Sequence, residues 1–203
     1  MMKLLVASSS AHKVAELSRI LMADHVMVDL VNLSGVPPYP EPVEDGSTFE
    51  ANALIKARAG FAATGLPTLA DDSGLEVDVL NGMPGVRSAR WAGGHGDDQE
   101  NLALLLRQID DVEPARRTAR FVAAMAVVAA SGETVVRGVV EGVLTSEPHG
   151  EHGFGYDPIF QPLGATRTTA QMPDADKDAI SHRGRALRAI IPTIRALAAK
   201  DET

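Results

Sequence analysis

One stretch of the chain places two carboxylates at the end of an apolar segment: Leu66-Pro67-Thr68-Leu69-Ala70-Asp71-Asp72-Ser73-Gly74. The apolar residues predict a buried strand, and Ser73-Gly74 predicts a turn directly after the aspartates. Because side chains alternate between the faces of a strand, Asp71 and Asp72 should point in different directions. Buried carboxylates are costly unless a cation or several donors meet them. The pair therefore indicates a site for a hard cation such as Mg²⁺; the alternative is a turn in which an aspartate caps backbone N–H groups.

The composition excludes several classes of protein. The 203 residues are 45% hydrophobic, which suits one large domain or two small lobes. A formal net charge of −8 disfavours nucleic-acid binding but allows a local basic pocket for a small phosphate ligand. The absence of cysteine excludes disulfides, thiolate zinc sites and thiol nucleophiles. The apolar run at the N-terminus is too short for a signal peptide and no run approaches the length of a membrane span, so we expect a cytoplasmic protein with no membrane partner.

The rest of the chain alternates predicted strands and helices. Ser47-Thr48-Phe49-Glu50 has the spacing of a capping box, and Pro192 should kink or split the last helix. This order predicts an α/β fold with a mixed sheet. The predicted strands are Lys3–Ala7, Val26–Leu33, Leu66–Ala70 and a hairpin of Arg120–Ala130 with Glu133–Leu144; the predicted helices are Ala11–Met22, one from near Ser47 toward Gly65, one from Asp97 or Asp98, and one from Ser181 to about Lys200.

Two motifs in the first quarter of the chain have charged side chains that suit an anion site and a metal site. Ser8-Ser9-Ser10-Ala11-His12-Lys13 turns from a strand into a helix whose first turn holds a lysine, and a helix N-terminus favours an anion. It is not a Walker A loop, and its alternative role is a capped helix with a solvated lysine. Glu44-Asp45-Gly46 comes before the next predicted helix. Glu44 either serves the dipole of that helix or reaches a metal ion held by Asp72.

Two later motifs have the character of a base-binding site. In Gly153-Phe154-Gly155-Tyr156-Asp157-Pro158, the glycines allow close backbone approach, Phe154 can stack on a base, and Asp157 can accept from a base edge or a ribose. The alternative is a turn whose aromatic residues pack on the hairpin. Lys177 and Ser181-His182-Arg183 place cations at a helix start, where the dipole disfavours them, so they indicate either function or a solvated helix start.

Together and in this order, the motifs resemble those of the inosine/xanthosine triphosphate pyrophosphatases, which hydrolyse non-standard purine nucleoside triphosphates. The resemblance extends over nearly the whole chain and includes Thr48–Ala53, Lys56-Ala57 and Gly82–Val86. One departure is that the first loop reads Ser8-Ser9-Ser10, where the family commonly has Thr-Gly-Asn.

The resemblance implies a fold, a cofactor and a set of site residues. The fold would be a single α/β domain over residues 1–203, elongated and two-lobed around a long mixed sheet with flanking helices, with a cleft between the lobes, and usually a homodimer. The cofactor would be Mg²⁺, with Asp72 as general base and metal ligand and Glu44 as a second metal position. The implied substrate-binding residues are Ser8, Ser9, Ser10, Ala11, His12, Lys13, Ser73, Phe154, Gly155, Tyr156, Asp157, Lys177, His182 and Arg183.

The leading hypothesis is a Mg²⁺-dependent pyrophosphatase that cleanses the nucleotide pool by converting ITP, dITP or XTP to the monophosphate and pyrophosphate. One alternative is a septum-associated (Maf-like) nucleotide pyrophosphatase acting on pyrimidine or modified nucleotides, against which the motifs at Gly153–Pro158 and Ser181–Gly184 argue. Another is a catalytically silent nucleotide-binding regulator. Against that alternative, the charged set is intact: Lys13, Asp72, Lys177 and Arg183 are all present.

Overall fold

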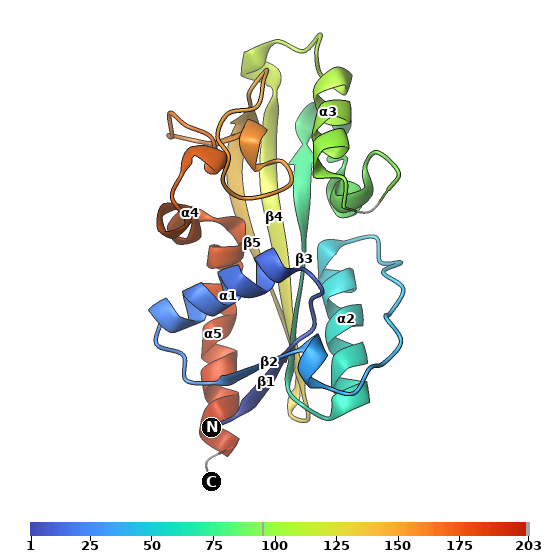
Figure 1. The fold of residues 1–203 in the computed structure, drawn as a ribbon, viewed down its shortest axis with the longest axis vertical. Coiled ribbons are helices and arrows are strands. Elements are labelled where there is room, and N and C mark those ends of the chain that lie inside the picture. Colours follow the sequence, from blue (N-terminus) through green and yellow to red (C-terminus); the bar gives the residue numbers. More distant parts are fainter. Residues whose placement is uncertain (95, 202–203) are drawn as a thin grey trace. The chain divides into compact units, whose positions relative to one another are not determined.

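A computed structural model describes residues 1–94 and 96–201 of the chain. It contains one six-stranded sheet in the order β2-β1-β3-β4-β5-β6, flanked by helices (Figure 1). β1 is parallel to β2 and β3, and β5 is antiparallel to β6, which confirms the predicted mixed α/β sheet. The strands are β1 Lys3–Val6, β2 Asp29–Asn32, β3 Thr68–Val77, β4 Thr118–Ala129, β5 Gly132–Leu144 and β6 Phe160–Pro162; the α-helices are α1 Ala11–Ala23, α2 Phe49–Thr64, α3 Asp98–Gln108, α4 Asp174–Ile180 and α5 His182–Asp201.

The chain divides into two compact units, which we describe separately. The three longest strands, β3, β4 and β5, contribute residues to both units. Unit 1 comprises Met1–Asp72, Ala123–Gly138 and Arg183–Thr203, and unit 2 comprises Ser73–Val122 and Val139–His182.

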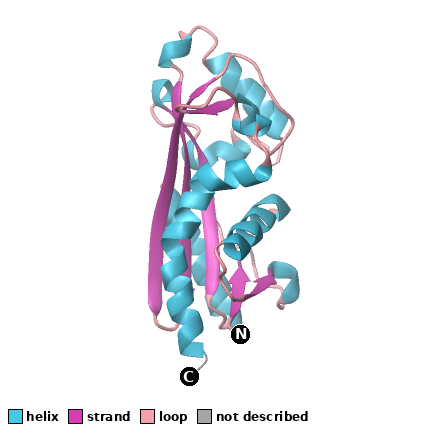
Figure 2. Ribbon diagram, turned by 90° about the vertical axis from the view of Figure 1, so that its left-hand side faces the viewer, coloured by secondary structure: helices cyan, strands magenta, loops and turns pink. Residues whose placement is uncertain are grey.

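Unit 1 has helices on both faces of its strands. Leu4 and Val6 point to one face, where they share a core with residues of α1, β4 and α5 such as Leu17 and Ile190. Figure 2 shows the C-terminal helix running beside the strands of this unit. α2 covers the opposite face, where a Cβ on Gly60 would lie 3.1 Å from the Leu5 side chain. The alternation of side chains along β1 therefore builds two apolar layers from one short strand.

Unit 2 has its own apolar core. Side chains of β3, α3 and β4, including Leu75, Leu105 and Phe121, pack together there with the segment that carries Tyr156 and Phe160. The phenyl rings of Phe121 and Phe160 are 4.4 Å apart between centroids. This core fixes the segment that holds the predicted base-binding motif.

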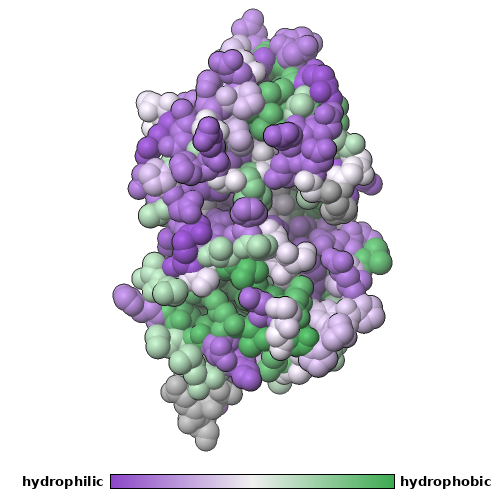
Figure 3. Space-filling model, in the orientation of Figure 1, coloured by the Kyte–Doolittle hydropathy of each residue, from purple (hydrophilic) through white to green (hydrophobic). Residues whose placement is uncertain are grey.

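The surface is mostly polar on the face shown in Figure 3, with an apolar area around α1, β1 and β2. Met22 and Met27 are among the large exposed apolar side chains of unit 1. Within the residues that the structure describes, no helix has both the length and the apolar character needed to span a bilayer.

Several predicted boundaries are wrong for identifiable reasons. The turn expected at Ser73-Gly74 does not occur, because β3 continues to Val77 and buries Leu75 and Val77 completely. Gly74 is needed there for close approach, since a Cβ would lie 2.6 Å from the Gly85 carbonyl oxygen. The N-cap of α2 is Thr48, whose hydroxyl accepts from the Ala51 N–H, rather than Ser47.

The C-terminal part of the chain also differs from the prediction. α5 continues through Pro192 to Asp201 and is not split. Two short elements, β6 and α4, were not predicted at all. With three and seven residues respectively, they are too short to give a periodic pattern.

Candidate functional site

Asp72 is buried in unit 1 at a position fixed by α2. Its Oδ2 accepts a hydrogen bond from the Asn52 side-chain amide at 3.0 Å, and its Oδ1 lies 3.6 Å from the Lys56 ammonium. Asn52 and Lys56 are four residues apart on α2, so both side chains lie on the same helix face. Asn52 also accepts from the Gly46 N–H at 2.8 Å. One amide thus fixes both the carboxylate and the loop that precedes α2.

Glu44 lies on that loop and contacts the same lysine, Lys56, as Asp72 does. Its Oε2 is 3.1 Å from Lys56 Nζ, so the ammonium contacts both Glu44 and Asp72. Burial alone would lower the pKa of Lys56, but Asp72, Asp71 and Glu44 together raise it above its ordinary value. The group is therefore a charged ammonium between two carboxylates.

This donor set fits the predicted Mg²⁺ ion. Mg²⁺ is commonly held by one or two carboxylates, with water and substrate phosphates completing its shell. Asp72 and Glu44 supply the carboxylates, and Lys56 demonstrates that a cation can contact both. Among the described residues, no group of three or more His, Cys, Asp or Glu side chains forms a larger metal site.

Asp71 has different partners from Asp72, as strand alternation predicts. Its Oδ2 is 3.0 Å from the Lys13 ammonium and 3.5 Å from Arg183 Nε. Arg183 also pairs with the buried Glu16 at 3.0 Å. Burial alone would raise the pKa of Asp71, but Lys13, Arg183 and Lys56 lower it to about 2. Asp71 is thus an ionised anchor for two cationic side chains of unit 1.

The ionisation of Asp72 is shifted the other way. Burial, the largest cause, raises the pKa of Asp72 above its ordinary value, although Lys56, Lys13 and the hydrogen bond from Asn52 oppose the shift. A carboxylate with a raised pKa is a stronger proton acceptor. Of the two neighbouring aspartates, Asp72 is therefore better suited to proton transfer and Asp71 to holding charge.

The start of α1 is capped by serine hydroxyl groups. Ser10 is the N-cap, and its Oγ accepts from the Lys13 N–H at 3.4 Å. Ser8 Oγ in turn accepts from the Ser10 N–H at 3.3 Å. Ser9, Ala11 and His12 are exposed around this turn. The N–H groups of a first helical turn, with Lys13 beside them, favour a negative ligand.

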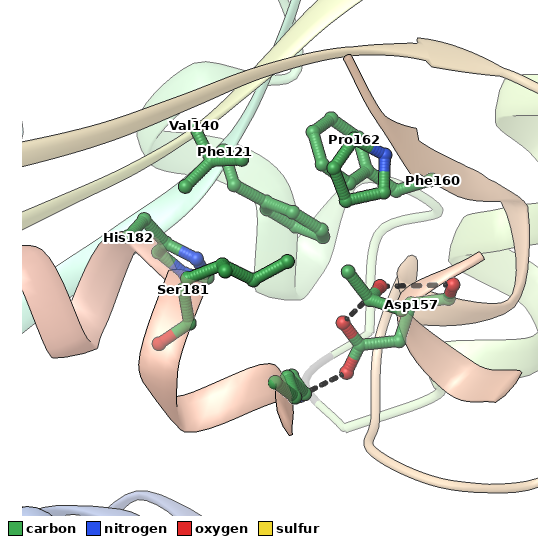
Figure 4. Close-up of a pocket in the computed structure, with 10 residues that line it drawn as sticks. Phe121, Val140, Asp157, Phe160, Pro162, Ser181 and His182 are labelled. Atoms are coloured by element: carbon green, nitrogen blue, oxygen red, sulfur yellow. Dashed lines mark hydrogen bonds and ion pairs between the residues drawn. The ribbon is translucent and has the colours of Figure 1, made fainter. Parts of the chain in front are cut away.

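In unit 2, Asp157 is the buried centre of a second polar cluster (Figure 4). Its Oδ2 accepts from Lys177 Nζ at 2.6 Å and from the Phe154 N–H at 2.9 Å, while its Oδ1 accepts from Thr169 Oγ1 at 2.7 Å. The Gly155 N–H donates to Asp98 Oδ2 at 2.8 Å. In this structure both oxygens of Asp157 accept protein donors, and they fix the Gly153–Asp157 turn.

A pocket adjoins this cluster within unit 2. Phe121, Phe160 and His182 line it together with Asp157 and Lys177 (Figure 4). The His182 imidazole stacks on the Phe121 ring, with centroids 4.7 Å apart and planes 12° from parallel. Lys177 Nζ lies 5.4 Å from the centroid of the Phe154 ring. The lining of this small pocket thus combines aromatic and aliphatic side chains with a few polar groups.

Two further residues predicted to bind substrate, Tyr156 and Ser73, lie next to these clusters. The Tyr156 hydroxyl donates to the Ser88 carbonyl at 2.9 Å, and burial raises the pKa of Tyr156, so this ring is part of the unit 2 core. Ser73 follows Asp72 directly in β3 and is half-buried in unit 2.

Comparison with known proteins identifies the family. The model of the Ham1 family matches residues 4–193. The chain belongs to the Ham1 family. It is 59% identical over 204 residues to a dITP/XTP pyrophosphatase of Nocardia farcinica, covering 100% of this chain and 99% of that protein. It is 56% identical over 197 residues to a dITP/XTP pyrophosphatase of Mycobacterium tuberculosis, covering 97% of each.

Solved structures agree with this assignment. A crystal structure of the nucleoside-triphosphatase / dITP/XTP pyrophosphatase of Mycobacterium abscessus is 56% identical, with a TM-score of 0.77 over 94% of this chain and 100% of that one. The Staphylococcus aureus Ham1 protein is 34% identical, with a TM-score of 0.85 over 96% of this chain and 98% of that one. The family resemblance drawn from the motifs is confirmed.

Several residues that contact the predicted site residues of this Ham1 chain were given no role from the sequence. Asn52 and Lys56 lie in stretches that matched the family, and their spacing of four was an available signal that both share a helix face. Glu16 could not be paired by spacing, since its partner Arg183 is 167 positions away. Thr169 and Asp98 contact the Gly153–Asp157 turn from distant segments that carry no motif.

Proposed function

We propose that this chain hydrolyses non-standard purine nucleoside triphosphates, among them dITP, ITP and XTP, to the monophosphate and pyrophosphate. The observation that carries the proposal is the buried Asp72 of unit 1, which is oriented by Asn52 and faces the Lys56 ammonium. This arrangement occurs in a chain that matches dITP/XTP pyrophosphatases over essentially its whole length. The family and the chemistry of the cluster therefore point to the same reaction.

The phosphate groups would bind to unit 1. The first turn of α1 offers N–H groups, and Lys13 adds a positive charge that Asp71 holds in place at 3.0 Å. Ser8, Ser9, Ser10, Ala11 and His12 would surround the phosphates at this turn. The overall charge of −8 does not oppose this binding, because short-range cations dominate over charges that are more than a Debye length away.

Asp72 would act on the attacking water. Its carboxylate would accept the water proton, and the hydrogen bond from Asn52 to Oδ2 leaves Oδ1 facing the Lys56 ammonium. We infer attack of water at the α-phosphorus, which forms a new P–O bond of the monophosphate and breaks the bond from the α-phosphorus to the α–β bridging oxygen, so that pyrophosphate leaves. A Mg²⁺ ion held by Asp72 and Glu44 would supply charge neutralisation of the phosphate oxygens.

The purine would be recognised by Phe154, His182 and Arg183. Phe154 offers a ring face, and His182 with Arg183 can donate to the 6-oxo group of hypoxanthine or xanthine. Adenine carries an amino group at that position, which would leave these donors unpaired, and such a mismatch discriminates strongly. Asp157 and Lys177 would act largely by fixing the Phe154 turn, given their mutual contact at 2.6 Å.

The proposal is tested by measuring pyrophosphate release across ITP, dITP, XTP, ATP, GTP and pyrimidine triphosphates, with Mg²⁺ and with a chelator. We expect turnover of the 6-oxo, non-standard purines and loss of turnover with the chelator. Asp72→Asn should lower turnover by about 10²–10⁴-fold. The exposed Asp45 provides a matched control, because Asp45→Asn changes the same charge in the same unit and should retain activity. Preference for pyrimidine triphosphates, or near-normal turnover in Asp72→Asn, would refute the assignment.

Two further properties are proposed from the resemblance alone. The protein would be a cytoplasmic homodimer. Sedimentation equilibrium measures the mass in solution, and fractionation of cells locates the protein; a monomer across the concentration range, or recovery outside the cytoplasm, would contradict these statements.

A further inference from the structure

The Lys56 ammonium contacts both of the carboxylates proposed to hold Mg²⁺. Its ammonium is 3.1 Å from Glu44 Oε2 and 3.6 Å from Asp72 Oδ1, and these are the two carboxylates assigned to Mg²⁺ above. The Lys56 side chain is 15% exposed and that of Asp72 is 12% exposed, so the contact is largely screened from water. A positive charge in this position offsets the repulsion between two carboxylates and the cost of burying one of them.

We propose that Lys56 is an internal cation that occupies the Asp72–Glu44 pair when no divalent ion is bound, and that competition with this ammonium sets the affinity of the pair for Mg²⁺. The inference rests on the metal site of the proposed function, and it adds the residue that controls the site. It also makes Lys56 a positioning residue for the free protein, because the ammonium keeps the two carboxylates together before any ion arrives.

The hydrogen bonds around Asp72 make such an exchange feasible. Asn52 donates to Oδ2, whereas Lys56 faces Oδ1, so departure of the ammonium leaves the carboxylate in the same orientation. The Asn52 amide is itself fixed by the Gly46 N–H, which belongs to the loop carrying Glu44. Lys56 has a long flexible stem and its charge is a compact ammonium, which can move away without disturbing α2.

The test is a calorimetric titration of the intact protein with Mg²⁺ in the absence of nucleotide. Lys56→Met removes the charge and keeps the apolar stem, and we expect its dissociation constant for Mg²⁺ to fall about tenfold or more, because a unit positive charge has been removed from contact with the site. Lys56→Arg retains the charge and should bind Mg²⁺ no more tightly than the wild type. Arg58→Met is the matched control, since it removes the same charge two positions later on α2, where Arg58 pairs with Glu133 at the surface.

A second readout is the thermal unfolding of the same variants with and without Mg²⁺. Lys56→Met should have a lower midpoint than the wild type without the ion and a larger upward shift when Mg²⁺ is added, because the ion then replaces the missing charge. Circular dichroism before the titration establishes that the variant is folded. The inference fails if folded Lys56→Met binds Mg²⁺ no more tightly than the wild type, or if neither protein binds the ion. Pyrophosphate release by the wild type tests the proposed function independently of this inference.

Discussion

Asp71 and Asp72 are neighbours in the chain, yet their side chains contact different partners. Lys13 and Arg183 meet Asp71, whereas Asn52 and Lys56 meet Asp72. The pKa of Asp71 falls to about 2 while burial raises that of Asp72. A one-residue step along β3 thus separates a carboxyl group with a lowered pKa from one with a raised pKa.

Because the pKa of Asp71 is lowered in the folded protein, this residue should account for part of the stability that the protein loses at acid pH. Because the folded-state pKa of about 2 is below the ordinary value of 3.8, ionised Asp71 stabilises the fold above about pH 4 and loses this contribution as the pH falls toward 2. We expect a loss on the order of 2 kcal/mol over this window from Asp71 alone. In Asp71→Asn, the free energy of unfolding should not show this loss between about pH 4 and 2. Urea unfolding at a series of pH values measures it.

The control for this experiment is Glu113→Gln, a carboxylate-to-amide change at an exposed position of unit 2. Its stability should follow the wild type across the acid range. If Asp71→Asn instead loses stability between pH 4 and 2 as steeply as the wild type, the ion pairs of Asp71 do not contribute as described.

At this scale, the sequence carried part of the information about the site. Alternation along a strand was enough to predict that Asp71 and Asp72 point in different directions, and the serine run predicted a capped helix, whose N-cap in the structure is Ser10. The partners of Asp71 could not be predicted, because Lys13 and Arg183 come from opposite ends of the chain and only the packing of α1 and α5 on one face brings them together.

The Gly153–Asp157 turn is the element on which base binding should depend. Gly153 has φ +77, and a Cβ there would collide with the Asp157 carboxylate and come within 3.0 Å of Lys177 Nζ. Gly153→Ala should therefore displace Asp157 from Lys177 and release the Phe154 N–H. We expect the KM for dITP to rise about tenfold or more, since a lost charge-assisted hydrogen bond is worth about 1.5–3 kcal/mol. Steady-state kinetics measures the change.

Gly155 is the matched control within the same turn. Its φ is +62, but a Cβ added there meets no atom within 4 Å. Gly155→Ala therefore carries the backbone strain of a left-handed alanine without the collision. Equal increases in KM for the two variants would mean that backbone conformation, rather than the Asp157–Lys177 contact, governs the turn.

At the scale of elements, prediction succeeded where local signals were strong. The β4–β5 hairpin was located by two long runs on either side of Ser131-Gly132, and the start of α3 was predicted at Asp97 or Asp98, of which the structure has Asp97 as the N-cap. The extension of β3 through Ser73 and Gly74 was missed, because these residue types usually indicate a turn. Here Gly74 lies within a strand and leaves room for the close approach of Ser88 and Gly85. Tertiary contacts of this kind leave no periodic pattern in the sequence.

At the scale of the whole molecule, the single-domain organisation is still a prediction, and the strands make it testable. Because β3, β4 and β5 contribute residues to both units, unfolding of one unit would break strands that continue into the other. We therefore expect one cooperative unfolding transition. Leu17, fully buried in unit 1, and Trp91, the single tryptophan and a residue of unit 2, provide a perturbation and a probe in different units.

Leu17→Ala should lower the midpoint of the thermal transition reported by Trp91 fluorescence, although the two residues belong to different units. Loss of a buried leucine side chain costs about 2–5 kcal/mol, and each kcal/mol lowers the midpoint by about 2–4 °C in a chain of this size. Leu163→Ala, at a position 67% exposed, is the control and should leave the midpoint unchanged. Hydrogen exchange of α1 and α3 then compares the units directly. If the Trp91 transition is unaffected while α1 loses protection, the units unfold independently and the chain is two domains.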